Sequence, residues 1–477
     1  MQRILRLFGN AQAEPENAQP PRLHANTPVE DPEVEHVDED DEDEEDDEGE
    51  EDDEDEEHDL RYWGPIKNIS NQALIDLTLS ILDPGKQLNA ENFLVLDQDE
   101  GTFHCVWIVE TPTREKIVIK VPATGHADRW TPEDAVNIKT EALTMAYLAK
   151  HTKAPVPAIL GFDCTFSNSI GAPYIMMGFV EGKPVHKVWY KHQHNIEEIR
   201  QNILTSLAKA MNEFGKLEFN KIGTLHFDGD QDPVVGPTHT FRVPKDIKDH
   251  PEDLGIAREL KTIPAFSTAK EYYEAALQEK EAMSRIDDRV RGIHKILRTA
   301  FAMPPFTKVD SAGKSTGGET FVLAHADLDL QNVYVDDDGN VTGLIDFDGI
   351  KTVPRCVGSA VPMWLRHDWR PQYVWPGEEY TTLSPQELDR YRNFYAKAML
   401  EVAGEDSDAK FTEKSAMFTA LHDALYGNGS AADAADKVLE SAFPRTHSWT
   451  FTTQLGEGGW KEGEEALRER LQNVLAC

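Results

Sequence analysis

The sequence predicts an α+β fold in which a small β-rich region precedes a larger, mostly helical one. Residues 93–121 contain three short segments rich in β-branched and aromatic residues, which is typical of strands. Residues 196–214 instead repeat apolar side chains every three or four positions, which is typical of a helix. A later stretch, 321–350, combines strand-like runs with a turn. With 477 residues, the chain is long enough to bury a large core.

An acidic block dominates the charge of the chain. The net charge is −38, and the 24 acidic residues between Glu30 and Asp59, which include no Lys or Arg, account for −24 and leave −14 for the rest. Residues 1–59 cannot bury enough apolar surface to offset the entropy of ordering, so we expect a disordered acidic N-terminal tail. Such a tail is either solubilising or a binding site for a basic protein. The acidic balance argues against nucleic-acid binding and is compatible with a cationic substrate.

Cysteine usage and hydropathy favour a location in the cytoplasm. The four cysteines form no C-x-x-C pair, which gives neither a disulfide framework nor a zinc site and fits the reducing cytoplasm; they are Cys105, Cys164, Cys356 and Cys477. No apolar run approaches the roughly 18 residues that span a membrane. The start MQRILRLF is basic and amphipathic, which leaves mitochondrial import as the alternative. Glu14, Glu16 and the acidic block are unlike a transit peptide.

Ordered structure is expected from about residue 60. Apolar residues at helical spacing predict a helix over 70–82, which Asp83-Pro84-Gly85 ends. Strand-like segments follow at 93–96, 103–109 and 116–121, with a polar turn at 97–102 between the first two.

A lysine and a glutamate stand at informative places after these strands. Lys120 lies near the end of the third strand-like segment. Thr131 followed by Pro132 is a good helix start, because the Thr side chain can cap the helix and Pro suits its first position. The helix predicted to begin there contains Glu141, which is followed by mostly apolar residues.

The second half of the chain reads mostly as helices. A helix is predicted over 196–214, and a second over 268–300 that is broken once. Between them, residues 226–265 are rich in Asp, Pro and Gly and predict a long, partly irregular insertion. Ser384-Pro385-Gln386-Glu387 is a capping box that opens another helix, and the C-terminal hundred residues should be mainly helical.

The strand-like runs in 321–350 predict a β-hairpin. Phe321 to Ala324 is an apolar run of the kind that forms a buried strand. Residues 333–335 and 341–345 then flank an Asp-Asp-Asp-Gly-Asn turn, as the two strands of a hairpin would. An ordinary acidic hairpin is the alternative to any catalytic interpretation.

Three polar residues at this hairpin point to phosphate chemistry. Asn332 and Asp346 are equidistant from Gly339, so a turn centred on that glycine would bring an amide oxygen and a carboxylate together at the open end. Two such oxygens suit Mg²⁺ that carries substrate phosphates. Asp327, five residues before Asn332, would lie on the preceding loop and could accept a proton.

At these residues the chain resembles a known family. HADLDLQN, residues 325–332, matches the H-x-D-x-x-x-x-N catalytic loop of the protein-kinase-like superfamily, and Ile345-Asp346-Phe347-Asp348 resembles its metal-binding D-F-G segment. The version here is similar to the aminoglycoside phosphotransferase and choline kinase branch. Residues 351–365 look like the fungal group of phosphotransferase-family proteins. The order of lysine, helix glutamate, hinge, catalytic loop and second Asp recurs across 93–348.

The resemblance implies a two-lobed, protein-kinase-like fold. Its small β-rich N-lobe would occupy 60–180, and the larger helical C-lobe, with the catalytic loop and acceptor site, 181–477. Gly101 would belong to a reduced form of the loop that covers the ATP phosphates. The segment after the β-rich region would be the hinge between the lobes, where backbone groups of Met177 and Phe179 are candidates to bind adenine.

The resemblance also gives the polar residues their roles. Asp327 would be the catalytic base that orients the acceptor hydroxyl and takes its proton. Asn332 and Asp346 would hold Mg²⁺ between phosphate oxygens. Lys120 would position the nucleotide, paired with Glu141; Glu133 and Asp134 in the first turn of the same helix are alternative partners, although the helix dipole explains their position.

These roles imply an ATP-dependent phosphotransferase that acts on the hydroxyl of a small molecule, with Mg²⁺. No A-P-E-type activation segment follows Asp346, which favours a small-molecule kinase over a protein kinase. A catalytically weak pseudokinase or scaffold is the alternative from a different class. The expected partners are ATP and a small-molecule acceptor, whose identity the sequence does not reveal.

Overall fold

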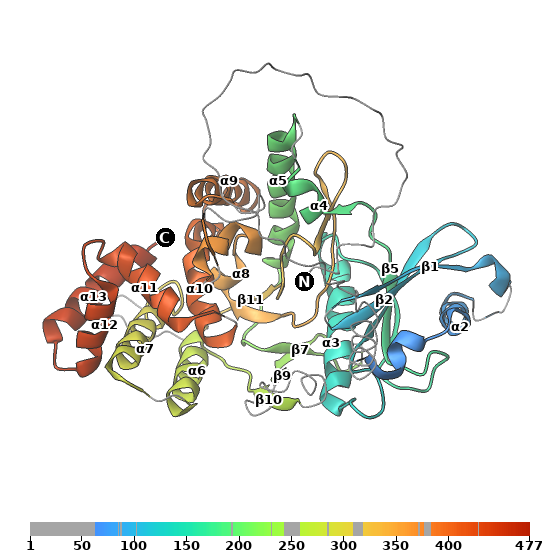
Figure 1. The fold of residues 1–477 in the computed structure, drawn as a ribbon, viewed down its shortest axis with the longest axis horizontal. Coiled ribbons are helices and arrows are strands. Elements are labelled where there is room, and N and C mark those ends of the chain that lie inside the picture. Colours follow the sequence, from blue (N-terminus) through green and yellow to red (C-terminus); the bar gives the residue numbers. More distant parts are fainter. Residues whose placement is uncertain are drawn as a thin grey trace, which may run out of the picture.

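The computed structural model describes most of the chain after the acidic block (Figure 1). The described residues are 63–83, 85, 88–101, 103–191, 194–229, 231–242, 258–283, 286–308, 318–370, 373–375, 383–427 and 429–477. The tail predicted over 1–59 and the basic start of the chain lie outside these residues.

The N-terminal part is built on a five-stranded antiparallel sheet in the order β1-β2-β3-β5-β4. Helix α2, which corresponds to the helix predicted over 70–82, packs against one face of the sheet. Helix α3 lies on the other face, nearer the rest of the chain (Figure 1). The elements are the 3-10 turns η2 (Gly64–Asn68) and η3 (Ala90–Asn92), the helices α2 (Asn71–Leu82) and α3 (Pro132–His151), and the strands β1 (Leu94–Glu100), β2 (His104–Glu110), β3 (Lys116–Pro122), β4 (Ile159–Asp163) and β5 (Tyr174–Gly178).

Strand β1 is longer than the sequence indicated. We predicted a strand at 93–96 and a turn at 97–102, but β1 continues through Glu100 and pairs with β2 after a bulge between Val95 and Asp97. Polar residues are tolerated there because β1 is an edge strand whose backbone pairs with β2 whatever its side chains are. The turn is therefore short, and the Gly101 N–H donates to the His104 carbonyl at 2.9 Å.

The alternation along β3 decides which side chain reaches the interior of the molecule. Ile117, Ile119 and Val121 are buried on the face that packs with α2. Val118 points to the opposite face and packs in the core that α3 shares with the C-terminal part. Side chains alternate between the two faces of a strand, so Lys120 lies on the same face as Val118, beneath α3.

The C-terminal part is mostly helical. The expected break in the 268–300 helix is present between α6 and α7, and the capping box at Ser384 opens α9 as predicted. The elements are α4 (His186–Trp189), α5 (Ile196–Phe214), α6 (Ala269–Met283), α7 (Asp288–Phe301), α8 (Arg355–Gly358), η5 (Met363–Trp369), α9 (Pro385–Ala403), η6 (Asp408–Lys414), α10 (Ser415–Tyr426), α11 (Ala431–Ala442), α12 (Ser448–Glu457) and α13 (Lys461–Leu475).

Short antiparallel ladders join this part together. The sheet β13-β12-β6 contains the predicted hairpin, and β11 pairs with β14 just beyond it. The strands are β6 (Lys183–Pro184), β7 (Thr224–His226), β8 (Val234–Gly236), β9 (Thr238–Arg242), β10 (Glu259–Ile263), β11 (Phe321–Ala324), β12 (Val333–Val335), β13 (Val341–Leu344) and β14 (Lys351–Pro354).

The segment 226–265 is more regular than predicted where the structure describes it. We expected a partly irregular insertion, but it holds β8, β9 and β10, and β9 pairs with β10 from Thr238 opposite Ile263 to Arg242 opposite Glu259. The many Asp, Pro and Gly residues hid short β-branched runs such as Val234-Val235. Residues 243–257, which connect β9 to β10, lie outside the description.

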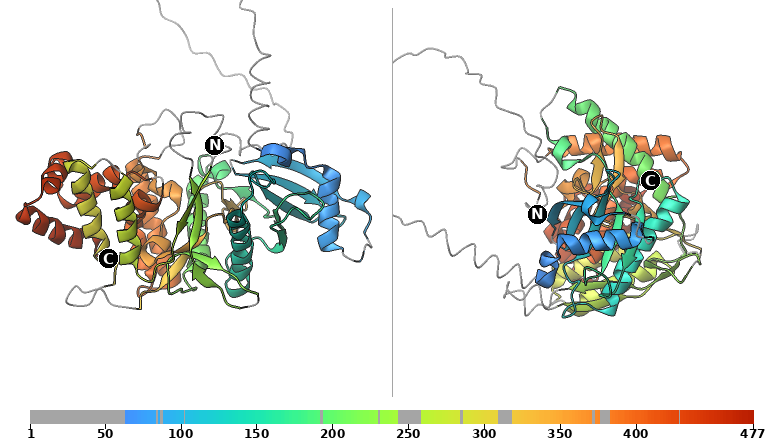
Figure 2. Two further views of the ribbon diagram at one scale, coloured as in Figure 1. Left: turned by 90° about the horizontal axis from the view of Figure 1, so that it is seen from below. Right: turned by 90° about the vertical axis from the view of Figure 1, so that its right-hand side faces the viewer.

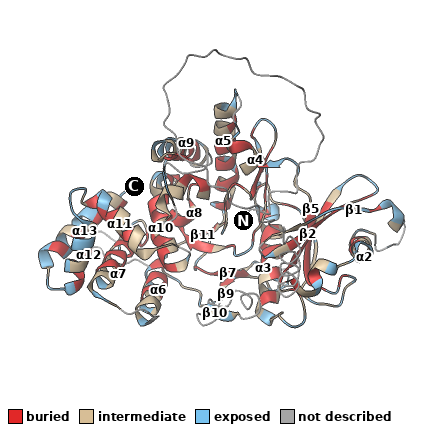
Figure 3. Ribbon diagram, viewed as in Figure 1, coloured by how far each residue is buried: buried red, intermediate tan, exposed pale blue. Residues whose placement is uncertain are grey.

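One large core connects the two parts of the molecule. It includes Ile138 and Ala142 of α3, Ile203 and Leu204 of α5, and Leu344 of the hairpin. Buried residues concentrate along α5, α3 and the strands between them (Figure 3). The sheet and the last helices lie at opposite ends of the molecule, with the hairpin between them (Figures 1 and 2). The predicted α+β fold, with a small β-rich part followed by a larger, mostly helical part, is confirmed.

Candidate active site

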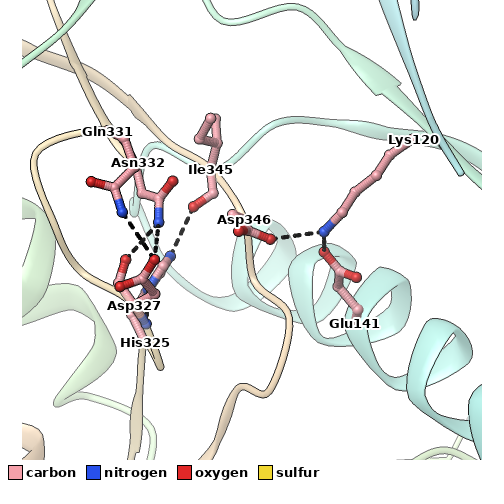
Figure 4. A network of polar contacts seen from close by, with 8 residues as sticks. All are labelled: Lys120, Glu141, His325, Asp327, Gln331, Asn332, Ile345 and Asp346. Carbon is pink, nitrogen blue, oxygen red and sulfur yellow. Dashed lines mark hydrogen bonds and ion pairs between the residues drawn. The ribbon is translucent and has the colours of Figure 1, made fainter. Parts of the chain in front are cut away.

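A lysine from the sheet, a glutamate from α3 and an aspartate from the C-terminal part meet in one cluster (Figure 4). The Lys120 Nζ donates to Glu141 Oε1 at 2.7 Å and to Asp346 Oδ1 at 2.9 Å. The side chains of Lys120 and Glu141 are 9% and 5% exposed, whereas that of Asp346 is 40% exposed. The predicted pair of Lys120 with Glu141 is therefore present in the structure, with Asp346 as a third member at the solvent side.

Helix α3 is held so that Glu141 reaches the lysine. Thr131 caps its first turn as predicted, within a capping box: Thr131 Oγ1 accepts from the Asp134 N–H, and an Asp134 carboxylate oxygen accepts from the Thr131 N–H. Asp134 also forms a two-pronged ion pair with Arg258 of the C-terminal part, at 2.9 and 2.8 Å. Asp134, an alternative partner for Lys120, therefore anchors the helix instead.

The hairpin register differs by one residue from the prediction. We expected Asn332 and Asp346 to be opposite each other, but β12 pairs with β13 so that Val333 faces Leu344, and the Ile345 N–H donates to the Asn332 carbonyl at 3.0 Å. The offset arises in the turn, which is centred before Gly339 because Val335 pairs with Val341; the bulge between Tyr334 and Val335 takes up one residue of it.

Asp346 lies two residues past Leu344, where that ladder ends, and has an unusual backbone conformation. Its φ is +61°, in the left-handed region that residues with a side chain seldom adopt. The turn directs its carboxylate toward Lys120 rather than along the hairpin (Figure 4). Strain of this kind is common at functional sites.

His325 braces the loop that carries Asp327. Its Nε2 donates to the Ile345 carbonyl at 2.9 Å, so its Nδ1 is the acceptor for the Asp327 N–H at 3.2 Å. Burial lowers the pKa of His325, which keeps the ring neutral and suits this donor-and-acceptor role. The ring also packs edge-on against Phe347, with 4.9 Å between the centroids. The imidazole thus connects the Asp327 loop to the residue that precedes Asp346.

Two amides hold the Asp327 carboxylate. Oδ2 of Asp327 accepts from Asn332 Nδ2 at 2.9 Å and from Gln331 Nε2 at 3.1 Å. Asn332 Nδ2 also donates to the Asp327 carbonyl at 2.8 Å, which closes the loop on itself. Within the described part of the chain, Asp327 Oδ1 has no hydrogen-bond partner. One oxygen of this carboxylate is fixed, and the other is left to face a ligand.

The charges in the cluster perturb one another. Burial raises the pKa of the Glu141 carboxyl to about 7, although Lys120 acts in the opposite direction. Burial would also raise the pKa of Asp346, but attraction to Lys120 outweighs it and holds that pKa well below the usual range. Burial, together with repulsion from Asp329 and Asp346, raises the pKa of Asp327. Asp346 is thus a firm anion, while Asp327 holds a proton more readily than an exposed aspartate.

The other predicted site residues lie around the sheet. Gly101 is in the turn between β1 and β2. Met177 is in the centre of the sheet, buried between Val118 of β3 and Ile159 of β4. Phe179 follows β5, and its N–H donates to the Lys116 carbonyl at 3.2 Å, so this donor is already used within the protein.

The structure adds two residues to which the sequence gave no role. Gln331 holds Asp327, and its place inside the HADLDLQN run, beside Asn332, was a usable signal. His104 begins β2 on the same face as Lys120; burial first, and then Lys120, lower its pKa to about 4. No motif marked His104, because only the pairing of β2 with β3 shows that it faces the cluster.

The oxygens at the site fit a metal ion that arrives with phosphate. Because Asn332 Nδ2 is used by Asp327, its Oδ1 is left for a ligand, and Asp346 keeps Oδ2 after Lys120 has taken Oδ1. Among the described residues, no group of three or more His, Cys, Asp or Glu side chains could hold a metal by itself. Mg²⁺ commonly takes one or two protein oxygens and completes its shell with substrate phosphates and water.

Comparison with known proteins places more than half of the chain in one family. The sequence profile of the phosphotransferase enzyme family matches residues 99–357. These limits include all the clustered residues, from Lys120 to Asp346, and Gly101.

Curated fungal proteins match shorter parts of the chain. "Altered inheritance of mitochondria protein 9, mitochondrial" of Meyerozyma guilliermondii is 30% identical over 131 residues, which are 28% of this chain and 21% of that protein. The protein of the same name from Kluyveromyces lactis is 19% identical over 310 residues, which are 56% of this chain and 49% of that protein. The chain thus matches less than half of the length of these relatives.

Among solved structures, the aminoglycoside phosphotransferase APH(4)-Ia is similar over most of the chain. The superposition covers 82% of this chain and 99% of that one, with a TM-score of 0.43 and 13% sequence identity. No helix in the described part of this chain is both long and apolar enough to cross a membrane.

Proposed function

The chain belongs to the phosphotransferase enzyme family, and from that premise we propose that it is an ATP-dependent kinase of a small molecule. It would transfer the γ-phosphoryl group to a hydroxyl with the assistance of Mg²⁺. The acceptor oxygen forms the new bond to phosphorus, the bond from phosphorus to ADP breaks, and the hydroxyl proton moves to the protein. Catalysis of this reaction depends mostly on positioning and on charge neutralisation.

Asp327 is our candidate for the catalytic base. Its Oδ2 is fixed by Gln331 and Asn332, which supports a role in which Oδ1 accepts the proton of the acceptor hydroxyl. The raised pKa of Asp327 supports the same role, because a stronger base takes a proton more readily. His325 positions this loop and takes no part in the proton transfer.

Lys120 is the candidate to bind the nucleotide phosphates. The carboxylates of Glu141 and Asp346 raise its pKa and so keep the ammonium charged in spite of burial. Glu141 would orient it through the 2.7 Å hydrogen bond. Gly101 and the backbone of Met177 and Phe179 remain weaker candidates for nucleotide contacts, since the Phe179 N–H already donates to the Lys116 carbonyl.

Asn332 and Asp346 are the candidates to hold Mg²⁺. When bound, the ion would neutralise the charge on the phosphate oxygens. The protein would provide Asn332 Oδ1 and the Asp346 carboxylate, which the left-handed backbone at Asp346 directs into the site. We also propose the division into an N-lobe at 60–180 and a C-lobe at 181–477, with the site between them.

The observation that carries the proposal is the meeting of Lys120, Glu141 and Asp346 within hydrogen-bond distance. These residues come from the sheet, from α3 and from the far end of the hairpin. The resemblance to the protein-kinase-like superfamily implies the same order of lysine, helix glutamate and second Asp. Without the Lys120–Glu141 contact, the polar loop at Asp327 would be explained equally well as an acidic hairpin.

The test is ADP formation by the purified full chain with ATP, Mg²⁺ and a panel of hydroxyl compounds. Asp327→Ala should lower acceptor-dependent turnover by about 100-fold or more, because a positioned base contributes at least that much. Nucleotide binding should stay close to that of wild type. Asp337→Ala is the matched control, since this aspartate lies in the same hairpin with an 87% exposed side chain.

Two other results would change the assignment. Tight ATP binding without turnover on any acceptor would favour the pseudokinase or scaffold, and phosphorylation of protein side chains alone would favour a protein kinase. Loss of ATP binding with Lys120 and Asp346 intact would refute the proposal.

The names of the fungal relatives bear on location. They include the word mitochondrial, which favours mitochondrial import, the alternative to the cytoplasm, for this chain. Partial overlap with those proteins makes this a proposal that localisation of the tagged full chain would test. The acidic segment at 30–59 remains a candidate to bind a basic protein.

A further inference from the structure

A cavity of about 240 Å³ lies in the C-terminal part beside the loop that carries Asp327. Its wall includes Ala326 and Leu328, the two chain neighbours of Asp327. The remaining wall comes mainly from α8, α10, β14 and η5. A molecule in this cavity would therefore have the candidate base at its edge, on a different side from the Lys120 cluster.

The charged residues of this cavity are mainly basic. Lys351 of β14 and Arg366 of η5 line it, and Asp423 of α10 is the only acidic residue among the described lining residues. Among the described lining residues, two basic side chains thus stand against one acidic side chain. This balance is notable in a chain whose net charge is −38.

The two cations are poorly paired inside the protein. Arg366 Nη1 lies 3.6 Å from Asp423 Oδ2, which is beyond hydrogen-bond distance, and its buried Nε has no partner in the described structure. The Arg366 side chain is only 15% exposed, so water replaces few of these contacts. Lys351 has no hydrogen bond or ion pair with any described residue. Buried cationic donors are normally paired, so this arrangement indicates a place for an anion.

His422, also on the cavity wall, does not change this balance of charge. Burial first, and then the nearby Lys351 and Arg366, lower its pKa to about 3. The ring is therefore neutral near pH 7, and it is hydrogen-bonded to the Tyr273 hydroxyl at 3.1 Å.

We propose that this cavity is the acceptor site and that the acceptor carries an anionic oxygen group, a carboxylate or a phosphate, besides the hydroxyl that is phosphorylated. Arg366 and Lys351 would bind the anionic group, and the hydroxyl would face Asp327. The inference rests on the proposed function and specifies its substrate class. The proposed acceptor is thus anionic, whereas the acidic composition of the chain was compatible with a cationic substrate.

A purely structural ion pair between η5 and α10 explains the geometry less well. A pair built for stability would be hydrogen-bonded, whereas Arg366 and Asp423 form a longer ion pair of 3.6 Å and the Asp423 side chain is 43% exposed. It would also leave Lys351 without a function. Arg366 is close enough to Asp327 and Asp329 for their charges to affect its pKa, which places the cation next to the candidate base.

The experiment measures binding of four hydroxyl compounds to the full chain by calorimetry, with Mg²⁺ and a non-hydrolysable ATP analogue present. The compounds are glycerate, glycerol phosphate, glycerol and choline, which carry a carboxylate, a phosphate, no charge and a cation. We expect glycerate or glycerol phosphate to bind and the other two not to bind. The two anionic arms distinguish a carboxylate from a phosphate ligand.

Variants locate the binding. Arg366→Gln and Lys351→Gln should each weaken binding of the anion by about 10-fold or more, which corresponds to roughly 1.4 kcal/mol. Arg366→Lys keeps the charge and should retain part of the affinity. Arg390→Gln is the control, because this arginine of α9 is 54% exposed and pairs with Glu197 away from the cavity. Unchanged melting temperature and nucleotide affinity would show that each variant is folded.

The inference fails if choline binds in preference, if the anion binds Arg366→Gln as well as wild type, or if neither anion binds at about 10 mM. Nucleotide affinity in the same samples separates this from failure of the proposed function. Anion binding without nucleotide binding would refute the kinase and leave an anion site. Asp327-dependent transfer to a neutral or cationic acceptor would refute the anionic acceptor alone.

Discussion

At the scale of single residues, the Asp327 carboxylate is asymmetric. Oδ2 accepts hydrogen bonds from Gln331 and Asn332, whereas Oδ1 has none from the described residues. Asp329, two residues along the loop, repels the charge on Asp327 and so helps to raise its pKa above the ordinary 3.8. Asp327 can act as a base only at pH values at which its carboxyl group is ionised.

The pH dependence of turnover should report this pKa. Activity should fall as the pH falls through the pKa of Asp327, so the acid limb of kcat/KM should lie above pH 3.8. Asp329→Asn removes one source of repulsion and should move that limb to lower pH. The measurement is the pH profile of kcat/KM for both proteins.

The comparison between variants is needed because Glu141 also titrates in this range. Its pKa is about 7, but the charges that act on it are those of Lys120, Asp348 and Asp346, not that of Asp329. A limb that stays in place in Asp329→Asn would therefore contradict the role of Asp327. Asp337→Asn, in the hairpin turn, should leave the profile unchanged.

The residues that the sequence could identify are those with a local pattern. Asp327 and Asn332 belong to one eight-residue run, and the structure joins them by direct hydrogen bonds. His104, Lys351 and Arg366 have no such pattern, because each becomes interesting only through neighbours from distant segments. A lysine at a strand end was recognisable at position 120 only because a helix with Glu141 followed it.

At the scale of elements, α7 and α12 pack with their backbones in close contact. A side chain added at Gly292 would place Cβ 1.8 Å from the Thr452 carbonyl oxygen, and one added at Gly456 would place it 1.6 Å from the Asp288 carbonyl oxygen. Each helix therefore presents a glycine to the backbone of the other. Neither glycine has a left-handed φ, so packing, not backbone freedom, explains them.

Gly292→Ala should destabilise the protein by about 1–3 kcal/mol or more, because the backbones would have to separate to admit the methyl group. Alanine otherwise favours a helix, so the sign of the effect distinguishes packing from propensity. The measurement is the free energy of unfolding by denaturant. Gly215→Ala is the control: it meets nothing closer than 3.6 Å, and an unchanged or higher stability is expected there. Equal effects at both positions would contradict the close contact.

Elements with a strong local signal were predicted well, and short strands were not. Helices α3 and α9 begin at the capping residues that the sequence displayed, and α2 and α5 lie where apolar periodicity predicted helices. The strands β8 to β10 were missed because runs of three to five residues cannot outweigh the surrounding Asp, Pro and Gly. The hairpin register differs by one residue from the prediction because the turn is centred before Gly339, and neither this offset nor the bulge has a sequence marker here.

At the scale of the whole molecule, one ion pair joins its two parts at the proposed site. Lys120 belongs to the sheet, and Asp346 follows the hairpin in the C-terminal part. A nucleotide that used Lys120 and a metal that used Asp346 would both have to exchange this contact for their own. Binding of the two ligands should therefore be interdependent.

Metal removal tests this dependence. A non-hydrolysable ATP analogue at about 100 times its Kd should stabilise wild type by roughly 2.7 kcal/mol when Mg²⁺ is present, and by clearly less with a chelator. Asp346→Asn should lose most of this difference, while Asp337→Asn should keep it. The measurement is the melting temperature with and without chelator. A metal dependence that is equal in wild type and Asp346→Asn would contradict the assignment of this ligand.

The cavity shows what the sequence could not reveal about the molecule as a whole. Lys351, Arg366 and Asp423 are supplied by β14, η5 and α10, and only the packing of these elements brings them together. The net charge even pointed to the opposite kind of substrate. Bulk composition reports on the average surface, whereas a binding site depends on a few side chains in one place.

The hairpin turn, which lies away from the candidate active site, helps to set the positions of the site residues. Its tip is clamped against α5: Asn202 donates to the Asp338 carbonyl at 2.9 Å, and Gly339 packs so closely that a Cβ would lie 2.7 Å from the Ile199 carbonyl oxygen. Because the tip is fixed, a change in its length would swing the other end, where Asn332 and Asp346 stand. An insertion in the turn should therefore displace Asn332 and Asp346 from each other without unfolding the protein.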